Sequence, residues 1–247
     1  MCWRTGRSIA LINFEYAGTE LDLFAAVRNW KSYWSELIRP FVRGDVLEVG
    51  AGIGSNTLFL NSGGTGRWVC LEPDARLATQ LTRNLEESNP ERKFETVIGT
   101  IQNLDSSWKF DTILYIDVLE HIDRDRQELQ NAVSKLRPEG RIIVLSPTHQ
   151  WLFTPFDAAI GHFRRYDRPM LRAISPPNLH LDRLSYIDSA GLVLSTANVS
   201  LLRQSIPTKA QLRIWDQYII PISRILNRFF LNSVGKSIFG IWCRESA

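Results

Sequence analysis

The sequence predicts an α/β fold in which a mainly parallel sheet carries helices on both faces. The first observation is that short apolar runs alternate with stretches of helical periodicity from residue 45 to residue 146. The second is that glycine, proline and asparagine separate these stretches. Strands that alternate with helices of about 10 to 15 residues form βαβ units, whose right-handed crossovers cover both faces of the sheet.

Length and composition predict a single domain. The chain has 247 residues, enough for one sizeable core, and its net charge of only +3 argues against a nucleic-acid partner. Its three cysteines stand in no disulfide or metal spacing, which predicts a cytoplasmic or membrane-peripheral protein. No apolar run reaches the roughly 20 residues that a membrane-spanning helix needs.

The elements are expected in a regular order. A single helix over residues 20–39 comes first, where apolar residues recur at helical spacing until Arg39-Pro40, and it would cap the ligand side of the sheet. The central core over residues 45–146 then follows. Its strands are expected at 45–49, 68–71, 94–98, 112–116 and 141–145, and its helices at 55–61, 74–88 and 124–136.

The regular alternation of strands and helices ends after the fifth strand. Residues 147–168 are rich in proline, histidine and aromatic residues without a period, which predicts an ordered loop at the active site. Residues 179–187 alternate as a sixth strand, and residues 236–244 are expected to form a seventh, antiparallel one. The helical insertion between them, residues 189–235, would act as a lid.

The turn after the first strand is the clearest candidate for a ligand site. Gly50, Gly52 and Gly54 let the backbone turn sharply and let a ligand approach the main chain. Glu72 ends the second strand 18 residues later, near the offset at which a carboxylate holds ribose hydroxyls. The G-x-G-x-G spacing differs from that of pyrophosphate sites, and the carboxylate of Glu48 would favour a ligand with positive charge. A tight turn without a ligand is the alternative.

These segments resemble the class I S-adenosylmethionine-dependent methyltransferases. Residues 48–54 are similar to the first motif of that family, Glu72 to its acidic ribose ligand, residues 117–121 to the segment after its fourth strand, and residues 136–140 to the turn into its fifth strand. The resemblance implies a Rossmann-like sheet of seven strands in the order 3-2-1-4-5-7-6. It also implies S-adenosylmethionine as cofactor and S-adenosylhomocysteine as product.

The same resemblance implies positions for the parts of the cofactor. Its methionine and ribose portions would lie against Gly50, Ala51, Gly52 and Glu72, and Asp117 would close the pocket on the methionine side. The adenine would lie over Thr100 and Ile101, although many relatives have an aspartate in place of this threonine.

Two further segments resemble a bacterial subgroup of these enzymes that is associated with polyprenyl-phosphate glycosyltransferases. They are residues 29–34 and residues 161–166. The resemblance implies an acceptor that is a small molecule or a lipid-linked glycan, and a glycosyltransferase as a partner.

Methyl transfer to a hydroxyl benefits from a base near neutral pKa. His162 is the preferred base, because four polar residues share its loop and could orient it or hold an anionic acceptor. They are Asp157, Arg164, Arg165 and Tyr166. His121 is expected in the wall of the pocket, and with His162 and Tyr166 it completes the catalytic candidates. The alternative is that residues 161–166 form a structural ion-pair network.

We expect no metal site and no nucleic-acid site. Asp117 stands where metal-dependent O-methyltransferases carry a ligand, but the spacing names no second and third oxygen ligand. No [DN]-P-P-[YFW] motif, which grips a flipped base, follows the fourth strand.

The insertion contains an amphipathic segment from Leu212 to Phe230. One arc is apolar and includes Trp215, Ile222 and Phe229. The opposite arc is predominantly basic, and Pro221 is expected to break or kink the helix. Its polar members are Arg213, Asp216, Arg224 and Arg228. Residues 199–235 would therefore contact an anionic membrane or a lipid phosphate; a helix docked on the core is the alternative.

The function that the sequence predicts is methyl transfer to a hydroxyl, less readily to a nitrogen, of a small-molecule or lipid-linked metabolite. Two alternatives stay open: an NAD-dependent oxidoreductase on a Rossmann sheet, and a catalytically idle module that binds a membrane surface or a partner.

Overall fold

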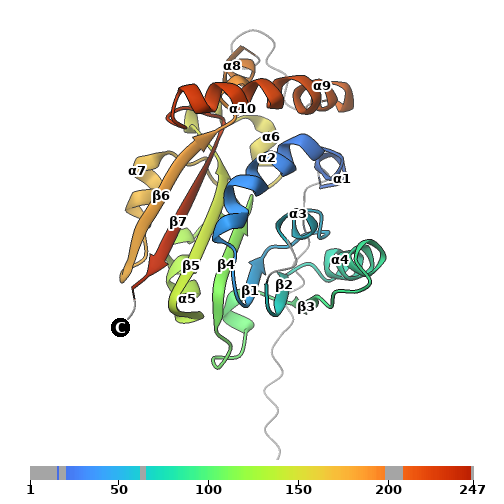
Figure 1. Ribbon diagram of the computed structural model, residues 1–247, viewed down its shortest axis with the longest axis vertical. Coiled ribbons are helices and arrows are strands. Elements are labelled where there is room, and N and C mark those ends of the chain that lie inside the picture. The colour runs from blue at the N-terminus through green and yellow to red at the C-terminus, as the bar shows by residue number, and fades with distance from the viewer. Residues whose placement is uncertain (1–15, 17–20, 62–64, 198–207, 246–247) are drawn as a thin grey trace, which may run out of the picture.

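The computed structural model describes residues 16, 21–61, 65–197 and 208–245 of the chain. They contain a seven-stranded sheet of order β3-β2-β1-β4-β5-β7-β6, which confirms the predicted order (Figure 1). β7 runs antiparallel to β5 and to β6, and the remaining pairs are parallel. The strands are β1 Val46–Val49, β2 Trp68–Glu72, β3 Glu95–Ile98, β4 Phe110–Ile116, β5 Leu136–Pro147, β6 Leu179–Ile187 and β7 Ser237–Arg244.

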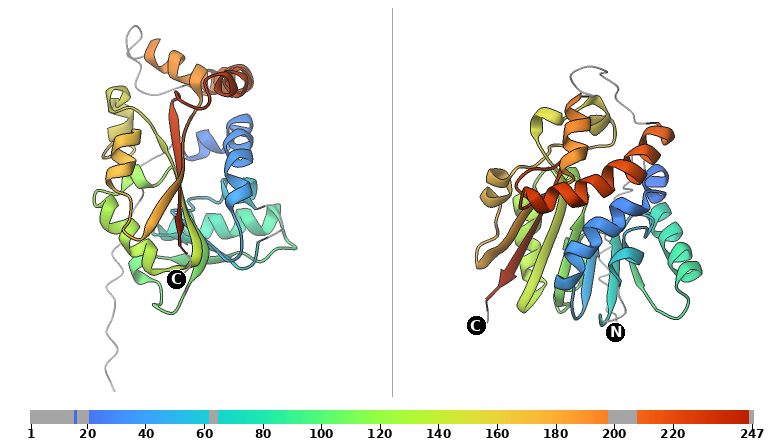
Figure 2. Two further views of the ribbon diagram at one scale, coloured as in Figure 1. Left: turned by 60° about the vertical axis from the view of Figure 1, so that its left-hand side comes forward. Right: turned by 45° about the horizontal axis from the view of Figure 1, so that its top comes forward.

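Helices lie on both faces of this sheet (Figure 2). One layer holds α2 Arg28–Ile38, α3 Thr57–Leu60 and α4 Ala75–Ser88, and the other holds α5 Asp125–Ser134 and α7 Arg168–Ala173. Short helices lie in the connections. They are α1 Leu21–Ala25, η1 Arg39–Phe41, η2 Ile101–Asn103, η3 Leu119–His121, η4 Gln150–Leu152 and α6 Pro155–Ala159.

The core forms two apolar layers because successive residues of a strand point to opposite faces. On β4, Leu114 and Ile116 belong to the cluster that contains Trp34 of α2, whereas Ile113 and Tyr115 belong to the cluster on the side of α5. The central strands are buried on both faces, and they therefore appear in the sequence as continuous apolar runs.

Two elements differ from their predicted form. The helix expected over residues 20–39 is divided into α1 and α2, because the chain is extended at Val27. The strand expected at 141–145 is longer, because Leu136 pairs with Phe110 across an irregularity in the register. Residues 136–140, which were expected to form the turn into this strand, therefore lie within β5.

The expected loop at residues 147–168 is partly helical. It contains η4 and α6, and a bridge between Thr148 and Tyr166 closes it against the end of β5. A capping box at Thr154 and Asp157 begins α6, since each side chain bonds to the backbone N–H of the other residue.

The insertion lies at the carboxyl edge of the sheet. β6 ends at this edge and the antiparallel β7 begins there, with Ile187 paired to Ser237, so the segment between them must leave and return at the same edge. It contains α8 Ser189–Ala197, α9 Lys209–Ile214, the π-helical turn η6 Trp215–Ile219 and α10 Ile220–Phe229, which lie across the top of the sheet in Figure 1.

Of the two effects predicted for Pro221, the break is wrong, because the helical segment continues through this residue. The turn η6 lies directly before it, and Pro221 occupies the first turn of α10, where a missing N–H is tolerated. The π-helical turn adds a residue and rotates the following face by about 100°. Ser223 and Asn227 are therefore buried, whereas Ile222 and Phe229 of the predicted apolar arc are exposed.

Membrane-spanning helices were sought among the described residues, and none is both long and apolar enough to cross a bilayer.

Candidate active site

The glycine turn after β1 provides open space next to the main chain. Gly50 and Gly52 have φ angles of 65° and 57°, a left-handed conformation that favours glycine. The N–H groups of Gly50 and Ala51 donate to the carbonyl oxygen of Leu71, at 2.8 and 3.2 Å. A Cβ on Gly50 would lie 2.7 Å from Val118, whereas a Cβ on Gly52 would meet its nearest described protein atom at 3.8 Å. The space over Gly52 can therefore admit a ligand.

Glu72 holds this turn from the end of β2. Its Oε2 accepts a hydrogen bond from the N–H of Gly52 at 2.8 Å, and its Oε1 accepts one from the N–H of Asp74 at 2.9 Å. Burial raises the pKa of Glu72, while these two donors act in the opposite direction. Each carboxylate oxygen retains a second lone pair, so Glu72 can accept from a ribose hydroxyl while it fixes the turn.

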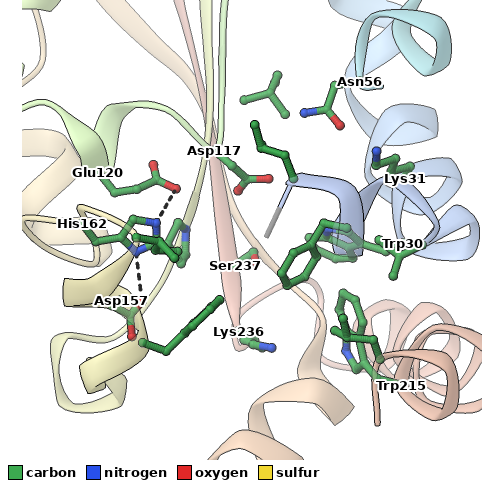
Figure 3. Close-up of a pocket in the computed structure, with 18 of the residues that line it drawn as sticks. Trp30, Lys31, Asn56, Asp117, Glu120, Asp157, His162, Trp215, Lys236 and Ser237 are labelled. Atoms are coloured by element: carbon green, nitrogen blue, oxygen red, sulfur yellow. Dashed lines mark hydrogen bonds and ion pairs between the residues drawn. The ribbon is translucent and has the colours of Figure 1, made fainter. Parts of the chain in front are cut away.

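A cavity of about 580 Å³ extends from the glycine turn along the carboxyl edge of the sheet (Figure 3). On one side lie Trp30 and Lys31 of α2 and Trp215 of the insertion. The two indole rings are 5.5 Å apart between centroids. Lys236 and Ser237, at the start of β7, lie at the far end.

The opposite wall carries carboxylates from the segment after β4. Asp117 has a φ of 55° and points toward the middle of the cavity (Figure 3). Burial raises its pKa to about 6, although His162, Lys31 and Lys236 act in the opposite direction. Burial and the nearby Asp117 likewise raise the pKa of Glu120, whose side chain is fully buried. A carboxyl group with a pKa near 6 is suited to accepting a proton at neutral pH.

His162 lies on this wall and is oriented by a carboxylate. Its Nδ1 is 3.0 Å from Asp157 Oδ1, and its Nε2 is 4.0 Å from Glu120 Oε1. Asp157 also accepts hydrogen bonds from Arg165 at 2.9 and 3.0 Å. Burial alone would raise the pKa of Asp157, but the hydrogen bonds from His162 and Arg165 hold it well below its usual range. The ion-pair network that was predicted as the alternative is thus present and includes His162. A catalytic role for His162 stays a prediction.

His121 packs edge-on against His162, with ring centroids 4.5 Å apart. Burial and the neighbouring His162 lower the pKa of His121 to about 4, although hydrogen bonds with the backbone of Gly161 and Ile160 oppose the shift. His121 is therefore neutral at pH 7. One of its ring nitrogens is then free to accept a proton or to bind a cation.

The structure brings half of the sequence-predicted site residues to the cavity. Those that line it are Gly50, Ala51, Gly52, Asp117, His121 and His162. Glu72 does not line the cavity itself, but it accepts a hydrogen bond from the N–H of Gly52, which does. Gly54 faces Leu81 and Leu85 of α4, Ile101 is fully buried in the core, and Thr100 is exposed and caps η2.

Glu48, a predicted cofactor ligand, lies elsewhere. It shares the face of β1 that points to α2 and α3, since residues of a strand alternate between faces. Its Oε2 accepts a hydrogen bond from Trp68 Nε1 at 3.1 Å, and the side chain is outside the cavity lining. Burial raises the pKa of Glu48 to about 7. Its geometry supports a role inside the core rather than contact with the cofactor.

The geometry also does not support the predicted catalytic role of Tyr166. Its hydroxyl donates to Asp125 Oδ2 at 2.7 Å, and the side chain is buried among the residues on the side of α5. Burial and the bond to Asp125 raise the pKa of Tyr166. It therefore anchors the end of the loop and does not reach the cavity.

Trp30, Lys31, Trp215 and Lys236 also line the cavity, although they were not predicted as site residues. Trp30 and Lys31 stood within the segment 29–34 and Trp215 on the apolar arc of the insertion, but their distance from the central core in the sequence gave no sign that they meet there. Glu120 stood within the quoted segment 117–121, and only its burial and its distance to His162 single it out.

The donor set of the cavity fits S-adenosylmethionine. The open space over Gly52 would admit the ligand beside the main chain, and Glu72 offers carboxylate oxygens at the end of β2. The volume also falls within the range of about 300 to 1,000 Å³ that is usual for ligand pockets.

Comparison with protein families finds one match, over residues 46–140, to the family described as Methyltransferase domain. A search of curated proteins finds no match at a significant level.

Solved structures share the fold at low sequence identity. An S-adenosylmethionine-dependent methyltransferase from Clostridium acetobutylicum ATCC 824 is 12% identical, with a TM-score of 0.58, and the alignment covers 92% of this chain and 96% of that chain. A geranyl diphosphate methyltransferase in complex with GPP and sinefungin is 13% identical, with a TM-score of 0.59 and coverage of 91% and 81%. The cyclase SpnF is 11% identical, with a TM-score of 0.62 and coverage of 87% and 81%. The fold is thus shared by methyltransferases and a cyclase, and it does not by itself define a substrate.

Proposed function

Because the chain carries a methyltransferase domain whose cofactor is S-adenosylmethionine, we propose that it transfers the methyl group to a hydroxyl of an amphipathic metabolite, either small or lipid-linked. The observation that carries this proposal is the wall formed by Asp117, Glu120, His121 and His162, which borders the same cavity as Gly52. Carboxylates and neutral imidazoles are the groups that accept the proton of a hydroxyl nucleophile.

S-adenosylmethionine supplies an activated methyl group, so the protein mainly orients the acceptor and excludes water. As the acceptor oxygen bonds to the methyl carbon, the bond from this carbon to sulfur breaks and its electron pair remains on the sulfur. The proton of the hydroxyl passes to a carboxylate or an imidazole of the wall. Asp117 and His121 are both placed for this step, since both line the cavity.

The other end of the cavity supports an acceptor that is partly apolar and partly anionic. Trp30, Trp215 and Leu212 provide apolar surface, and Lys236 provides a positive charge that forms no salt bridge among the described residues. The ammonium group of a lysine beside indole rings suits a phosphate or carboxylate that is attached to a hydrocarbon. The resemblance of residues 29–34 and 161–166 to enzymes associated with polyprenyl-phosphate glycosyltransferases supports the same class and a glycosyltransferase partner.

Methyl-labelled S-adenosylmethionine tests the acceptor class. Wild-type protein would be incubated with cell extract separated into aqueous and organic fractions, and labelled products identified by mass spectrometry. We expect the label on an oxygen of an organic-phase, anionic compound, and its loss in Asp117→Asn but not in His180→Gln, which changes an exposed histidine of β6. A label that is found only on amines in the aqueous fraction would contradict the proposal.

We also propose that the insertion lies on an anionic membrane, at the cytoplasmic face. Its outer side exposes apolar side chains, with Ile225 60%, Phe229 78% and Leu231 86% exposed. Arg213 and Arg228 are exposed in the same segment and form no salt bridge among the described residues. Apolar residues flanked by arginines match the interface of an anionic bilayer, where an acceptor with a lipid carrier would be found.

Vesicle co-sedimentation tests this surface. We expect wild-type protein to bind vesicles that contain anionic lipid, and the double variant Phe229→Ser, Leu231→Ser to bind about tenfold less, since both side chains are exposed. The control variant Trp151→Ser removes an exposed aromatic residue of the 147–168 loop and should bind as the wild type does. Equal, negligible binding to neutral and anionic vesicles would contradict the membrane proposal alone.

The family match leaves the alternative of a nicotinamide-dependent oxidoreductase without support. A catalytically idle module would bind S-adenosylhomocysteine weakly and would label no acceptor in the first experiment.

A further inference from the structure

Three side chains with metal-binding atoms converge on one wall of the cavity. Glu120 and His121 come from η3, and His162 comes from the loop after α6. One carboxylate oxygen and one nitrogen from each ring all lie within 4.8 Å of one another. Figure 3 shows Glu120 and His162 facing each other across this short gap. The topology thus brings together residues that are 41 positions apart in the chain.

One atom of this cluster is buried without a hydrogen bond. Glu120 Oε2 accepts a hydrogen bond from Ser146 at 3.0 Å, but Oε1 has no hydrogen-bond partner among the described residues. His162 Nε2 lies 4.0 Å from Oε1, which is too far for a hydrogen bond. Burial of an uncompensated carboxylate oxygen is costly, so the position calls for a positively charged ligand.

The gap has the size that a metal ion requires. Two ligand atoms that each lie about 2.1 Å from one ion are separated by roughly 3 to 4 Å. The distance of 4.0 Å between Glu120 Oε1 and His162 Nε2 is at the upper end of this range.

Outer partners orient both imidazole rings. His162 Nδ1 is bound to Asp157 Oδ1, which leaves Nε2 directed toward Glu120. The ring of His121 is hydrogen-bonded to the backbone of Gly161 and Ile160. Histidines that bind metals usually have their second nitrogen fixed in this way, by a carboxylate or a backbone carbonyl.

We propose that Glu120, His121 and His162 bind one divalent transition-metal cation, with Zn²⁺ as the best match. Two imidazoles and one carboxylate, with a remaining open position, form the ligand set of catalytic zinc sites. Asp117 lines the same cavity and is available as a further oxygen ligand or as a base. This proposal replaces the expectation of no metal, which was based on oxygen ligands at recognisable spacing and did not consider the histidine contributed by the distant loop.

The role of the cation rests on the proposed function. Coordination of the acceptor hydroxyl would lower its pKa, so that its proton leaves to Asp117 or to water before the oxygen bonds to the methyl carbon. His121 and His162 would then act as ligands, and neither would accept the proton. Binding of the cation itself does not depend on this role.

Titration with zinc chloride alone tests the site. The full chain, treated with chelator and dialysed, would be titrated by calorimetry at pH 7.5, and Co²⁺ binding would be followed by visible absorption as evidence of imidazole coordination. We expect one Zn²⁺ per chain with a dissociation constant of micromolar or lower, and at least about 100-fold weaker binding in Glu120→Gln and in His162→Gln. His180→Gln, on exposed β6, should bind as the wild type does.

Thermal unfolding without metal separates ligand loss from misfolding. Glu120→Gln removes a buried charge, so its melting temperature without metal should equal or exceed that of the wild type. Zn²⁺ should raise the melting temperature of the wild type and not that of Glu120→Gln. Zn²⁺ binding that is absent, or equal in wild type, Glu120→Gln and His162→Gln, would overturn the proposal. Binding of S-adenosylhomocysteine, measured in the same samples, shows separately whether the proposed function fails.

Discussion

The two ends of the cavity are built in different ways. At the cofactor end, adjacent elements of the central core supply the contacts: Gly50 and Ala51 bond to the end of β2, and Glu72 bonds back to Gly52. At the acceptor end, distant segments supply them. Asp216 of the insertion accepts hydrogen bonds from the backbone N–H groups of Arg28, Asn29 and Trp30, at 2.8 to 3.2 Å and across at least 186 residues.

This difference explains how the acceptor wall is held. Val27, at the start of α2, offers no side-chain cap. The carboxylate of Asp216, a residue of the insertion, caps the helix instead. A carboxylate at a helix N-terminus satisfies free N–H groups and the helix dipole together. The insertion is thereby fixed to the helix that carries Trp30 and Lys31, both of which line the cavity. The geometry of this end of the cavity therefore depends on contacts between segments that are far apart in the sequence.

The largest effect is expected at the glycine turn. Gly52→Ala would place a Cβ in the open space beside the main chain, and we expect affinity for S-adenosylhomocysteine to fall at least about 100-fold, or about 2.7 kcal/mol. Gly54→Ala carries the same backbone strain, with a φ of 80°, but its Cβ would meet Leu85 instead. Calorimetric titration of both variants makes the comparison. An equal loss in both would mean that strain, and not contact with the ligand, causes the effect.

The next effect tests the long-range cap. Asp216→Ala removes an acceptor of three backbone N–H groups, and we expect the free energy of unfolding to fall by about 2 to 3 kcal/mol. Arg213→Ala, an exposed residue of the same segment, should change it by less than about 0.5 kcal/mol. Urea denaturation measures both. If the two variants were equally stable, the insertion would not be held through this cap.

The cofactor end could be predicted from the sequence more fully than the acceptor end, because the two ends are built in different ways. The turn after β1, the sheet order and half of the site residues could be predicted, because they depend on short-range spacing and on the alternation of strands and helices. Asp216 was predicted on the polar arc of the helical segment and is buried, because the N-terminus of α2 packs on it and three backbone N–H groups there bond to its carboxylate. No sequence pattern predicts this long-range contact, and none predicts that Lys236 and Trp30 line one cavity.

Glu48 gives a pH dependence of stability within the core. Burial raises its pKa to about 7, so the folded state retains a proton that the unfolded state loses at lower pH. The contribution of Glu48 to the free energy of unfolding should therefore be fully present below about pH 4.5. It should fall by about 2 kcal/mol as the pH rises from 5 to 8. Glu48→Gln should remove this decline. Denaturation at both pH values checks the result, and an unchanged decline in the variant would assign it to another group.

The smallest effect concerns the adenine. Thr100 is exposed and caps η2, and aspartate is also a good capping residue, so Thr100→Asp should leave stability unchanged within about 0.5 kcal/mol. If the adenine lies over this residue, the new carboxylate should accept a hydrogen bond from its amino group and improve affinity for S-adenosylhomocysteine about threefold. Affinity that is unchanged or lower would place the adenine elsewhere.

The central claim is that the cofactor end of this cavity holds S-adenosylmethionine. Calorimetric titration of the wild-type chain with S-adenosylhomocysteine, and separately with NAD, tests it most directly. The structure predicts one molecule of S-adenosylhomocysteine bound per chain, with affinity lost in Gly52→Ala, and no measurable binding of NAD. Binding of NAD in preference to S-adenosylhomocysteine, or no binding of either, would contradict it.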